Sequence, residues 1–468
     1  MLTKADFKPY QEWMTQKLID LPFCALWADM GLGKTVTTLT ACEDLLDTCQ
    51  ADKILVVSTC HNVDVTWPDE PKEWEHLQHI EIVPIRGTPA KRLELLKHPS
   101  PYHTINVEGL KWLTSLYPIK RNRKTGERRT DWPYDVVVLD ESGLFRKYDT
   151  NRFKALKRLR PFIKRMIQLT GTPAPKGLTN LWSQAYLLDG GERLGRTLTS
   201  FRQRWFTKSY DGFNWEPNMG AEHEITSLLA DICFTLKRED YVTLPPVTVN
   251  PIICKIPPAR MAEYREFEKE SVQEFGGEII DADNAGVLHG RLLQLAGGAI
   301  YIDDQHNFHE FHDKKLDILA DLVDEASGKP MIVAYNFKSD KIRMQKRFPK
   351  MVFLADHKKD SKDLVRRWNN DEIEVLGLNP KSAAHGLNLQ KGHAAGITWF
   401  SLTPDLELWM QLNGRLDRTG QRYPTVNNVI VAEGTVDEKT VDSLSAKDAT
   451  QASITEAFRC YVNAFGSL

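Results

Sequence analysis

The chain has 468 residues, 41% of them hydrophobic and 26% charged, with a formal net charge of −2. These values are typical of a globular protein of about three domains, and they exclude a disordered or fibrous chain. No apolar run is long enough for a transmembrane helix, and the N-terminus lacks the apolar stretch of a signal peptide. The 7 cysteines are scattered, and none form a Cys-x-x-Cys pair. This pattern favours a protein of a reducing compartment and argues against a structural zinc site in the chain. We therefore expect a cytoplasmic protein without membrane contact.

The first segment, residues 1–190, alternates apolar β-branched runs with helical patterns. The runs are typical of buried parallel strands, and they lie at 53–59, 102–107, 134–142 and 164–172. Strands that alternate with helices predict βαβ units and a parallel sheet.

The second segment, residues 191–310, has a different character, being rich in aromatic residues and glycine. It contains a helical pattern at 261–277 and an extended, proline-rich stretch at 242–260. We expect an α-rich insertion without a parallel sheet of its own. The third segment, 311–435, returns to α/β alternation, and residues 436–468 predict a C-terminal helical arm.

The stretch LWADMGLGKTVTTL, Leu26–Leu39, predicts a strand end, a glycine-rich turn and a helix start. It matches a phosphate-binding loop, except that Ala28 replaces the first glycine. Backbone N–H groups, the Lys34 ammonium and the Thr35 hydroxyl would then bind phosphates and Mg²⁺. The alternative is a glycine-rich turn that binds no ligand.

Two further groups suit phosphate chemistry. Asp140 and Glu141 end a predicted strand, where one carboxylate suits Mg²⁺ and the other an attacking water. A strand-end acid pair without a ligand is the alternative. Arg415 and Arg418 share one helical face and suit a triphosphate. Since Asp417 lies between them, a solvated charged helix is the alternative.

The order of these motifs resembles helicase superfamily 2. The stretches DMGLGKT, VVVLDES, LTGTPAPKGLTNLW, SAAHGLNLQ and QLNGRLDRTGQ, together with LKREDYVTLPP, resemble the Swi/Snf-type ATPases. The similarity covers nearly the whole chain and is greatest to the compact phage and bacterial versions. It implies two RecA-like lobes with ATP in the cleft between them, and Mg²⁺ as cofactor.

The resemblance also implies site residues. Lys34, Asp140, Glu141, Arg415 and Arg418 would be catalytic, with Thr35 and Asp140 toward the metal. The predicted nucleotide-binding residues are Tyr10, Gln11, Asp29, Met30, Gly31, Leu32, Gly33, Lys34, Thr35, Gly386, Gln411, Arg415 and Arg418. The predicted DNA-binding residues are Thr59, Trp67, Asn106, Glu108, Gly109, Arg146, Asn336, Lys338, Lys381 and Ser382. For the tryptophan, core packing is the favoured alternative.

The sequence departs from the family in two motifs. Ser142 and Gly143 follow the acid pair where the family often has Ala-His, which removes a histidine that couples the ATP site to the TGTP motif. Ala383 and Ala384 stand where many members have Gly-Gly. Both changes leave the predicted metal acid and base in place, so we expect activity to be kept.

Two basic stretches are candidates for phosphate contacts. KRNRKTGERR, residues 120–129, precedes the acid pair, and RFKALKRLRPFIKR, residues 152–165, follows it. Their charges could neutralise phosphates without reading sequence. A solvated charged surface is the alternative for both, and it is favoured for 120–129.

The resemblance implies an ATP-driven motor that moves along double-stranded DNA and contacts mostly its phosphate backbone. Protein partners cannot be identified from the sequence. One alternative is a strand-separating or branch-migrating helicase, which would need a wedge such as a hairpin, and only residues 191–310 offer room for one. The other is a non-catalytic, ATP-switched scaffold, which would be expected to have lost Lys34, Glu141 or Arg418. None of the three is lost.

Overall fold

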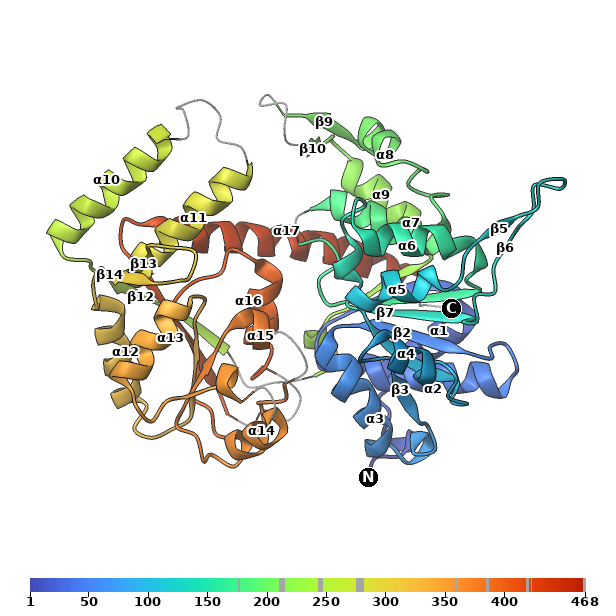
Figure 1. Cartoon of the computed structure of the whole chain (residues 1–468), viewed down its shortest axis with the longest axis horizontal. Coiled ribbons are helices and arrows are strands. Elements are labelled where there is room, and N and C mark those ends of the chain that lie inside the picture. Colours follow the sequence, from blue (N-terminus) through green and yellow to red (C-terminus); the bar gives the residue numbers. More distant parts are fainter. Residues whose placement is uncertain are drawn as a thin grey trace. The chain divides into compact units, whose positions relative to one another are not determined.

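The computed structural model describes residues 1–175, 177–209, 215–242, 247–274, 282–357, 360–383, 387–417, 421 and 423–465. The chain divides into two compact units, one of Met1–Val242 with Asp448–Leu468 and one of Thr243–Lys447. Each unit contains a parallel sheet flanked by helices (Figure 1). The predicted α/β class with two parallel sheets is confirmed.

In its described residues, the first unit has a seven-stranded sheet in the order β11-β1-β8-β7-β2-β4-β3. Every neighbouring pair is parallel. The strands are β1 (Phe23–Ala28), β2 (Ile54–Ser58), β3 (Ile82–Pro84), β4 (Tyr102–Asn106), β7 (Val136–Asp140), β8 (Arg165–Leu169) and β11 (Cys233–Leu236). Strands β2, β4 and β7 are buried along their whole length, because helices cover both faces of the sheet.

Two apolar clusters form the core of this unit, one on each face of the sheet. Along β1, Ala25 and Trp27 belong to one cluster, whereas Cys24 and Leu26 belong to the other, as the two-residue period of a strand requires. The helices are α1 (Pro9–Asp20), α2 (Lys34–Asp47), α3 (Trp67–Glu73), α4 (Pro89–Leu95), α5 (Leu110–Ser115), α6 (Asn151–Leu159), α7 (Leu181–Asp189), α8 (Leu198–Trp205) and α9 (Ala221–Leu229).

Two antiparallel hairpins accompany this sheet. One joins β5 (Lys120–Arg121) to β6 (Arg128–Arg129), and the other joins β9 (Phe206–Lys208) to β10 (Trp215–Pro217). The first hairpin extends away from the body of the unit (Figure 1). The expectation that only residues 191–310 have room for a hairpin is therefore wrong, because β5 and β6 lie in the first segment.

The described part of the second unit has a six-stranded parallel sheet in the order β12-β19-β18-β15-β17-β16. Its strands are β12 (Val247–Cys254), β15 (Met331–Ala334), β16 (Val352–Phe353), β17 (Val375–Leu378), β18 (Gly396–Trp399) and β19 (Thr425–Ala432). A small hairpin pairs β13 (Ala299–Tyr301) with β14 (Phe308–Glu310). The helices are α10 (Pro258–Glu274), α11 (Ala282–Gly297), α12 (Lys314–Glu325), α13 (Lys338–Arg347), α14 (Ser361–Asn369), α15 (Pro380–Ala383), α16 (Leu406–Asn413) and α17 (Val436–Phe465).

The boundaries of the units differ from the predicted segments. Residues 191–310 are divided between the two units at Val242, and both parts contribute a strand to a parallel sheet. Strand β11 pairs with β1, and β12 pairs with β19. Strand β12 was hard to predict because it contains Pro251 and because most of its residues are exposed. Proline is tolerated there because β12 is an edge strand. The boundary between the units also falls within α17, because its residues up to Lys447 belong to the second unit and those from Asp448 belong to the first.

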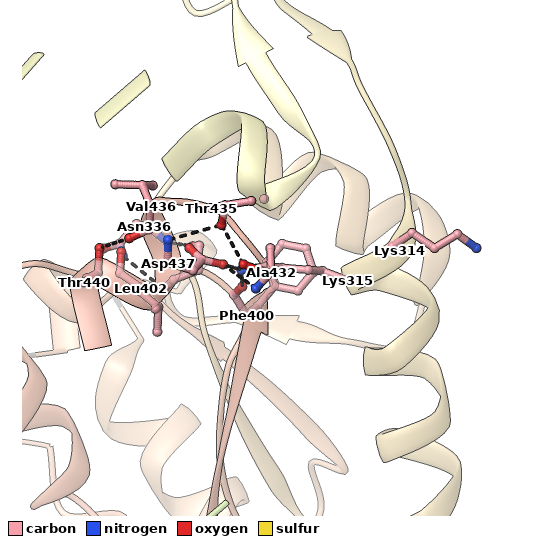
Figure 2. A network of polar contacts seen from close by, with 12 residues as sticks. Lys314, Lys315, Asn336, Phe400, Leu402, Ala432, Thr435, Val436, Asp437 and Thr440 are labelled. Atoms are coloured by element: carbon pink, nitrogen blue, oxygen red, sulfur yellow. Dashed lines mark hydrogen bonds and ion pairs between the residues drawn. The ribbon is translucent and has the colours of Figure 1, made fainter. Parts of the chain in front are cut away.

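A buried ion pair lies at one end of the second sheet. Lys315 Nζ lies 2.6 Å from Asp437 Oδ2, and both side chains are 1% exposed. Lys315 also donates to the Phe400 carbonyl, and the Ala432 N–H donates to Asp437 (Figure 2). The pair thereby connects α12, the start of α17, the residue that follows β18 and the last residue of β19.

A buried histidine in the first sheet predicts acid sensitivity. Burial lowers the pKa of His103 to about 4 from an ordinary value of 6.5, and its Nδ1 lies 2.8 Å from the Tyr134 hydroxyl. Between these two pH values the unfolded chain binds more protons, so stability falls as the pH falls, by at most about 1.4 kcal/mol per pH unit. We expect His103→Gln to reduce this dependence in denaturant titrations at pH 7 and pH 5. The exposed control His309→Gln should not change it; equal slopes for all three proteins would contradict the prediction.

Candidate functional site

The strand order of the first sheet brings the predicted motifs together. In a parallel sheet all strands end at the same edge, where ligands usually bind. The phosphate loop follows β1, the TGTP stretch follows β8, and the acid pair lies at the end of β7. These three strands are neighbours, and β2 and β4, which precede the predicted DNA-contact motifs, come next. Motifs far apart in sequence thus share one edge.

The phosphate loop forms the predicted strand–turn–helix. Gly31 and Gly33 have φ values of 85° and 78°, a backbone conformation that favours glycine. Helix α2 begins at Lys34, so its first N–H groups face the turn. Lys34 Nζ donates to the carbonyls of Ala28 at 2.6 Å and Asp29 at 3.1 Å. These are the groups that a phosphate site requires.

Two further predicted nucleotide-binding residues, Tyr10 and Gln11, lie on α1, and Gln11 lies beside this loop. A Cβ on Gly33 would come within 2.3 Å of Gln11 Nε2, so only glycine allows the Gln11 amide to approach the turn. The other end of that amide, Oε1, accepts from the Lys8 N–H at 2.9 Å. The Tyr10 ring packs against the Tyr241 ring, with 4.7 Å between the ring centroids, and burial raises the pKa of Tyr10. The Gln11 amide therefore lies beside the phosphate loop, and Tyr10 precedes it on α1.

A second contact anchors the loop to the strand beside β1. The Arg238 N–H donates to Asp29 Oδ2 at 2.9 Å, and the Asp29 N–H donates to the Leu236 carbonyl at 3.1 Å. The segment after β11, part of the family-like stretch LKREDYVTLPP, thus holds the phosphate loop in position. Met30 and Asp29 are half-buried and Leu32 is buried, which agrees with a role in shaping the loop.

The predicted metal acid is oriented by donors from a second chain segment. Asp140 Oδ2 accepts from Ser58 Oγ at 2.7 Å, Asn62 Nδ2 at 3.0 Å and Trp67 Nε1 at 2.9 Å. Trp67 is completely buried, as the favoured alternative of core packing expects, and its contact with DNA stays a prediction. A large apolar ring with one N–H donor is most stable in the core when that donor has a partner, and here the partner is Asp140.

Glu141 and Ser142 connect the acid pair to the TGTP stretch. Glu141 has φ 65° and ψ 62°, a conformation that costs a non-glycine residue roughly 1–3 kcal/mol, and Thr170 Oγ1 donates to its carboxylate at 3.4 Å. Ser142 Oγ donates to Gln184 Oε1 at 2.8 Å, and Gln184 Nε2 donates to the Pro173 carbonyl at 2.7 Å. Ser142 and Gln184 therefore provide a connection between the two motifs in a chain that lacks the family's histidine.

Several of the predicted DNA-binding residues of the first unit lie at the ends of β2, β4 and β7. Asn106 is buried and donates to Glu108 at 2.7 Å, and Gly109 is buried beside it. Glu108 is exposed, whereas Thr59 and Arg146 are half-buried. The Asn106 side chain is buried and bonded to Glu108, and Gly109 has no side chain, so contact of either residue with DNA would use the backbone.

In the second unit, the corresponding residues lie at the ends of β15 and β17, which are neighbours. Lys338, Lys381 and Ser382 are exposed there. Asn336 differs, because its Nδ2 donates to the carbonyls of Ser401 at 3.1 Å and Leu402 at 2.6 Å. The Asn336 amide donor therefore holds the segment that leads into α16 (Figure 2), and contact of Asn336 with DNA stays a prediction.

The last motif lies at and just after the end of α16. Arg415 is 3% exposed and donates to the Leu387 carbonyl at 3.3 Å, and Gln411 is buried with its Nε2 3.4 Å from Glu407. Arg415 is thus held against the segment that carries the GLNL motif. Gly386 and Arg418 lie outside the described residues.

Sequence reasoning missed three residues of this site: Ser58, Asn62 and Gln184. The first two lie next to Thr59 and before Trp67, which were predicted to bind DNA, and their partner is Asp140. Gln184 is a buried polar residue in the otherwise mostly apolar helix LWSQAYLLD. A buried amide must find hydrogen-bond partners, so its position in an apolar helix was the signal that could have identified it.

Comparison with known proteins gives a consistent result. Residues 10–294 match the family described as the SNF2-related domain. Protein p41 of Acyrthosiphon pisum secondary endosymbiont phage 1 is 36% identical over 469 residues, which cover 97% of this chain and 98% of that protein. The SWI/SNF-related matrix-associated actin-dependent regulator of chromatin subfamily A-like protein 1 of Drosophila melanogaster is 22% identical over 88% of this chain and 50% of its own length. The solved SWI2/SNF2 ATPase core of Sulfolobus solfataricus in complex with dsDNA is 20% identical to this chain. The match covers 97% of this chain and 94% of that chain, with a TM-score of 0.43.

None of the helices in the described part of the chain has the length and apolar composition of a membrane span.

Proposed function

Since this chain belongs to the SNF2 family of ATPase motor cores, we propose that it hydrolyses ATP in order to move along double-stranded DNA. The observation that carries the proposal is the shared strand edge, at which the phosphate loop, the acid pair and the TGTP stretch follow three neighbouring strands. An ATP site needs these groups on one edge, and a chance glycine-rich turn would not bring them together.

The proposed reaction is attack of water on the γ-phosphorus of ATP. The new bond joins the water oxygen to phosphorus, the bond to the β-phosphate oxygen breaks, and ADP and phosphate leave. Glu141 accepts the proton of the water, and Lys34 stabilises charge on the phosphate oxygens. The resemblance to the family implies that Arg415 and Arg418 add positive charge to the phosphate. The half-buried Glu141, with Thr170 donating to it, supports the role of a positioned base.

The groups around Asp140 also fit Mg²⁺. Carboxylate and hydroxyl oxygens are the ligands that this ion prefers, and Asp140 and Thr35 supply them. The ion would neutralise phosphate charge. The three donors to Asp140 Oδ2 in the described chain would fix the orientation of the carboxylate, and this is the chain's own contribution to the metal site.

Trp67→Phe tests that contribution. The change keeps most of the buried ring but removes the N–H donor to Asp140. Because loss of a group that orients a metal ligand typically costs about 10-fold to 100-fold in activity or metal affinity, we expect a lower kcat or a higher Mg²⁺ requirement within that range. Steady-state hydrolysis in a Mg²⁺ titration measures both. Trp13→Phe, at a half-buried tryptophan far from Asp140 in the sequence, is the control. An unchanged Mg²⁺ dependence and kcat for Trp67→Phe would contradict the proposed orientation.

The proposed DNA partner rests on polar residues at the strand edge of each unit, which are exposed in the second unit and half-buried in the first. Lys338, Lys381 and Ser382 in the second unit, with Thr59 and Arg146 in the first, would contact phosphates. Contacts to phosphate rather than to bases predict sequence-independent binding, as movement along DNA requires.

The decisive experiment is ATP hydrolysis by the purified chain, alone and with plain duplex, single-stranded DNA, forked DNA or RNA. Strong stimulation by plain duplex supports a double-stranded-DNA translocase. Preference for forks or single strands would replace that proposal with a strand-separating helicase. Stimulation by RNA alone would overturn the DNA assignment. Nucleotide binding without turnover under any condition would instead favour the ATP-switched scaffold.

A further inference from the structure

The β5–β6 hairpin carries the densest positive charge that the motifs do not use. Residues 120–129 contain six lysines and arginines and one glutamate, whereas the whole chain has a net charge of −2. Every residue from 120 to 129 is exposed. We propose that this hairpin is a second nucleic-acid contact, which binds the phosphate backbone of duplex DNA outside the predicted motifs.

The hairpin is a formed arm with a packed base. At the base, the ring centroids of Tyr117 and Trp132 are 5.5 Å apart, and those of Trp132 and Tyr134 are 5.1 Å apart. Thr130 Oγ1 donates to the Tyr117 carbonyl at 3.2 Å. These contacts fix the arm on the first unit, so the charges at its tip are presented from a defined place.

The tip is an ordered turn. Asn122 Oδ1 accepts from the N–H groups of Lys124 at 2.9 Å and Thr125 at 3.3 Å. Gly126 has φ 73°, and its N–H donates to the Asn122 carbonyl at 2.9 Å. Asparagine and glycine are the residues that such turns favour, so the sequence specifies the turn and places Arg123 and Lys124 at its end.

The pairing of the two strands places like charges opposite each other. Lys120 is paired with Arg129, and Arg121 with Arg128. Directly opposed like charges destabilise an antiparallel pair. Lys120 and Arg129 are partly compensated by Asp131 at 3.3 Å and Glu127 at 3.0 Å. On the other face, the Arg128 guanidinium carbon lies 5.9 Å from the centroid of the Phe162 ring. Arg121 lies directly opposite Arg128 on the paired strand. A polyanion would relieve this repulsion, which is why the arrangement indicates a binding surface.

The chemistry of the arm favours phosphate over other anionic partners. Four of the six cations are arginines, whose planar fork suits phosphate oxygens. Residues 120–129 include no apolar side chain that could insert into a membrane or anchor a protein interface. The binding would therefore be electrostatic and independent of DNA sequence.

The test compares the full-length triple variant Arg121→Ala/Arg123→Ala/Lys124→Ala with the wild type. Duplex affinity is measured without nucleotide over a series of salt concentrations. We expect weaker binding, and a slope of log affinity against log salt that is smaller by about 0.9 for each phosphate that the variant no longer neutralises. The variant Lys72→Ala/Lys91→Ala/Lys97→Ala removes the same charge from exposed positions of the same unit and should keep the wild-type slope.

Further measurements separate this inference from the proposed function. Hydrolysis without DNA should be unchanged in both triple variants, because none of these residues belongs to the ATP site. The conservative variant Arg121→Lys/Arg123→Lys should retain most of the salt slope. A reduced slope in the hairpin variant would support the second contact even if the wild-type chain hydrolysed no ATP. Wild-type slope and affinity in that variant, or a loss confined to binding of anionic lipid vesicles, would overturn it.

Discussion

Lys34→Ala is expected to lower the rate of ATP hydrolysis by at least about a hundredfold, the usual loss when one donor to a developing oxyanion is removed. Lys34 begins α2, and its ammonium lies inside the phosphate loop, at 2.6 Å from the Ala28 carbonyl. Alanine is the best helix former, so the variant should fold. Loss of the charge removes the side-chain cation that the first unit directs at the loop, whereas the backbone N–H groups remain.

Glu141→Gln is the companion variant. It keeps the size of the side chain but cannot accept a proton, so turnover should fall while nucleotide still binds. Both variants should bind duplex DNA within a few-fold of the wild type, because neither residue lies among those predicted to contact phosphates of DNA. The exposed Lys97→Ala is the control for the loss of one charge. Hydrolysis near the wild-type rate in either variant would overturn the assignment of the ATP site.

Removal of one partner of the Lys315–Asp437 pair is expected to destabilise the second unit by about 3–5 kcal/mol, because it leaves a buried charge without its counterion. Both side chains are 1% exposed. Lys315→Met removes the ammonium, together with its bond to the Phe400 carbonyl, and leaves the Asp437 carboxylate buried. Hydrogen exchange at the amides of β19 and α12 is the appropriate measurement, because two units need not unfold in a single step.

Lys314 provides a matched control. It is the preceding residue on α12, but its side chain points away from the network (Figure 2) and is 48% exposed in an ion pair with Asp317. Lys314→Met should change stability by less than about 1 kcal/mol. The double variant Lys315→Met/Asp437→Leu should recover part of the stability, since replacing both charges by apolar groups is often nearly neutral. Equal effects of the two lysine variants would show that burial of the pair does not matter.

Much of the site was predictable from the sequence because its signals are local. The turn that requires Gly31 and Gly33, the helix that begins at Lys34, and the acid pair at the end of an apolar run all depend on a few neighbouring residues. The alternation of apolar strands with helices likewise predicted two parallel sheets. Order along the chain added the rest, because the same succession of motifs is typical of one family of ATPases.

The tertiary structure decided which side chains serve these motifs. Trp67 and Asp140 are separated by 73 positions, and Lys315 and Asp437 by 122, so no local pattern connects them. Core packing was the favoured alternative for Trp67, but only the fold shows that a buried carboxylate is its partner, and the same holds for Lys315. Likewise, the repulsion between Arg121 and Arg128 arises only from strand register. The sequence by itself determined the chemistry at each strand end, and long-range packing determined the partners, because burial and hydrogen bonding depend on contacts that only folding creates.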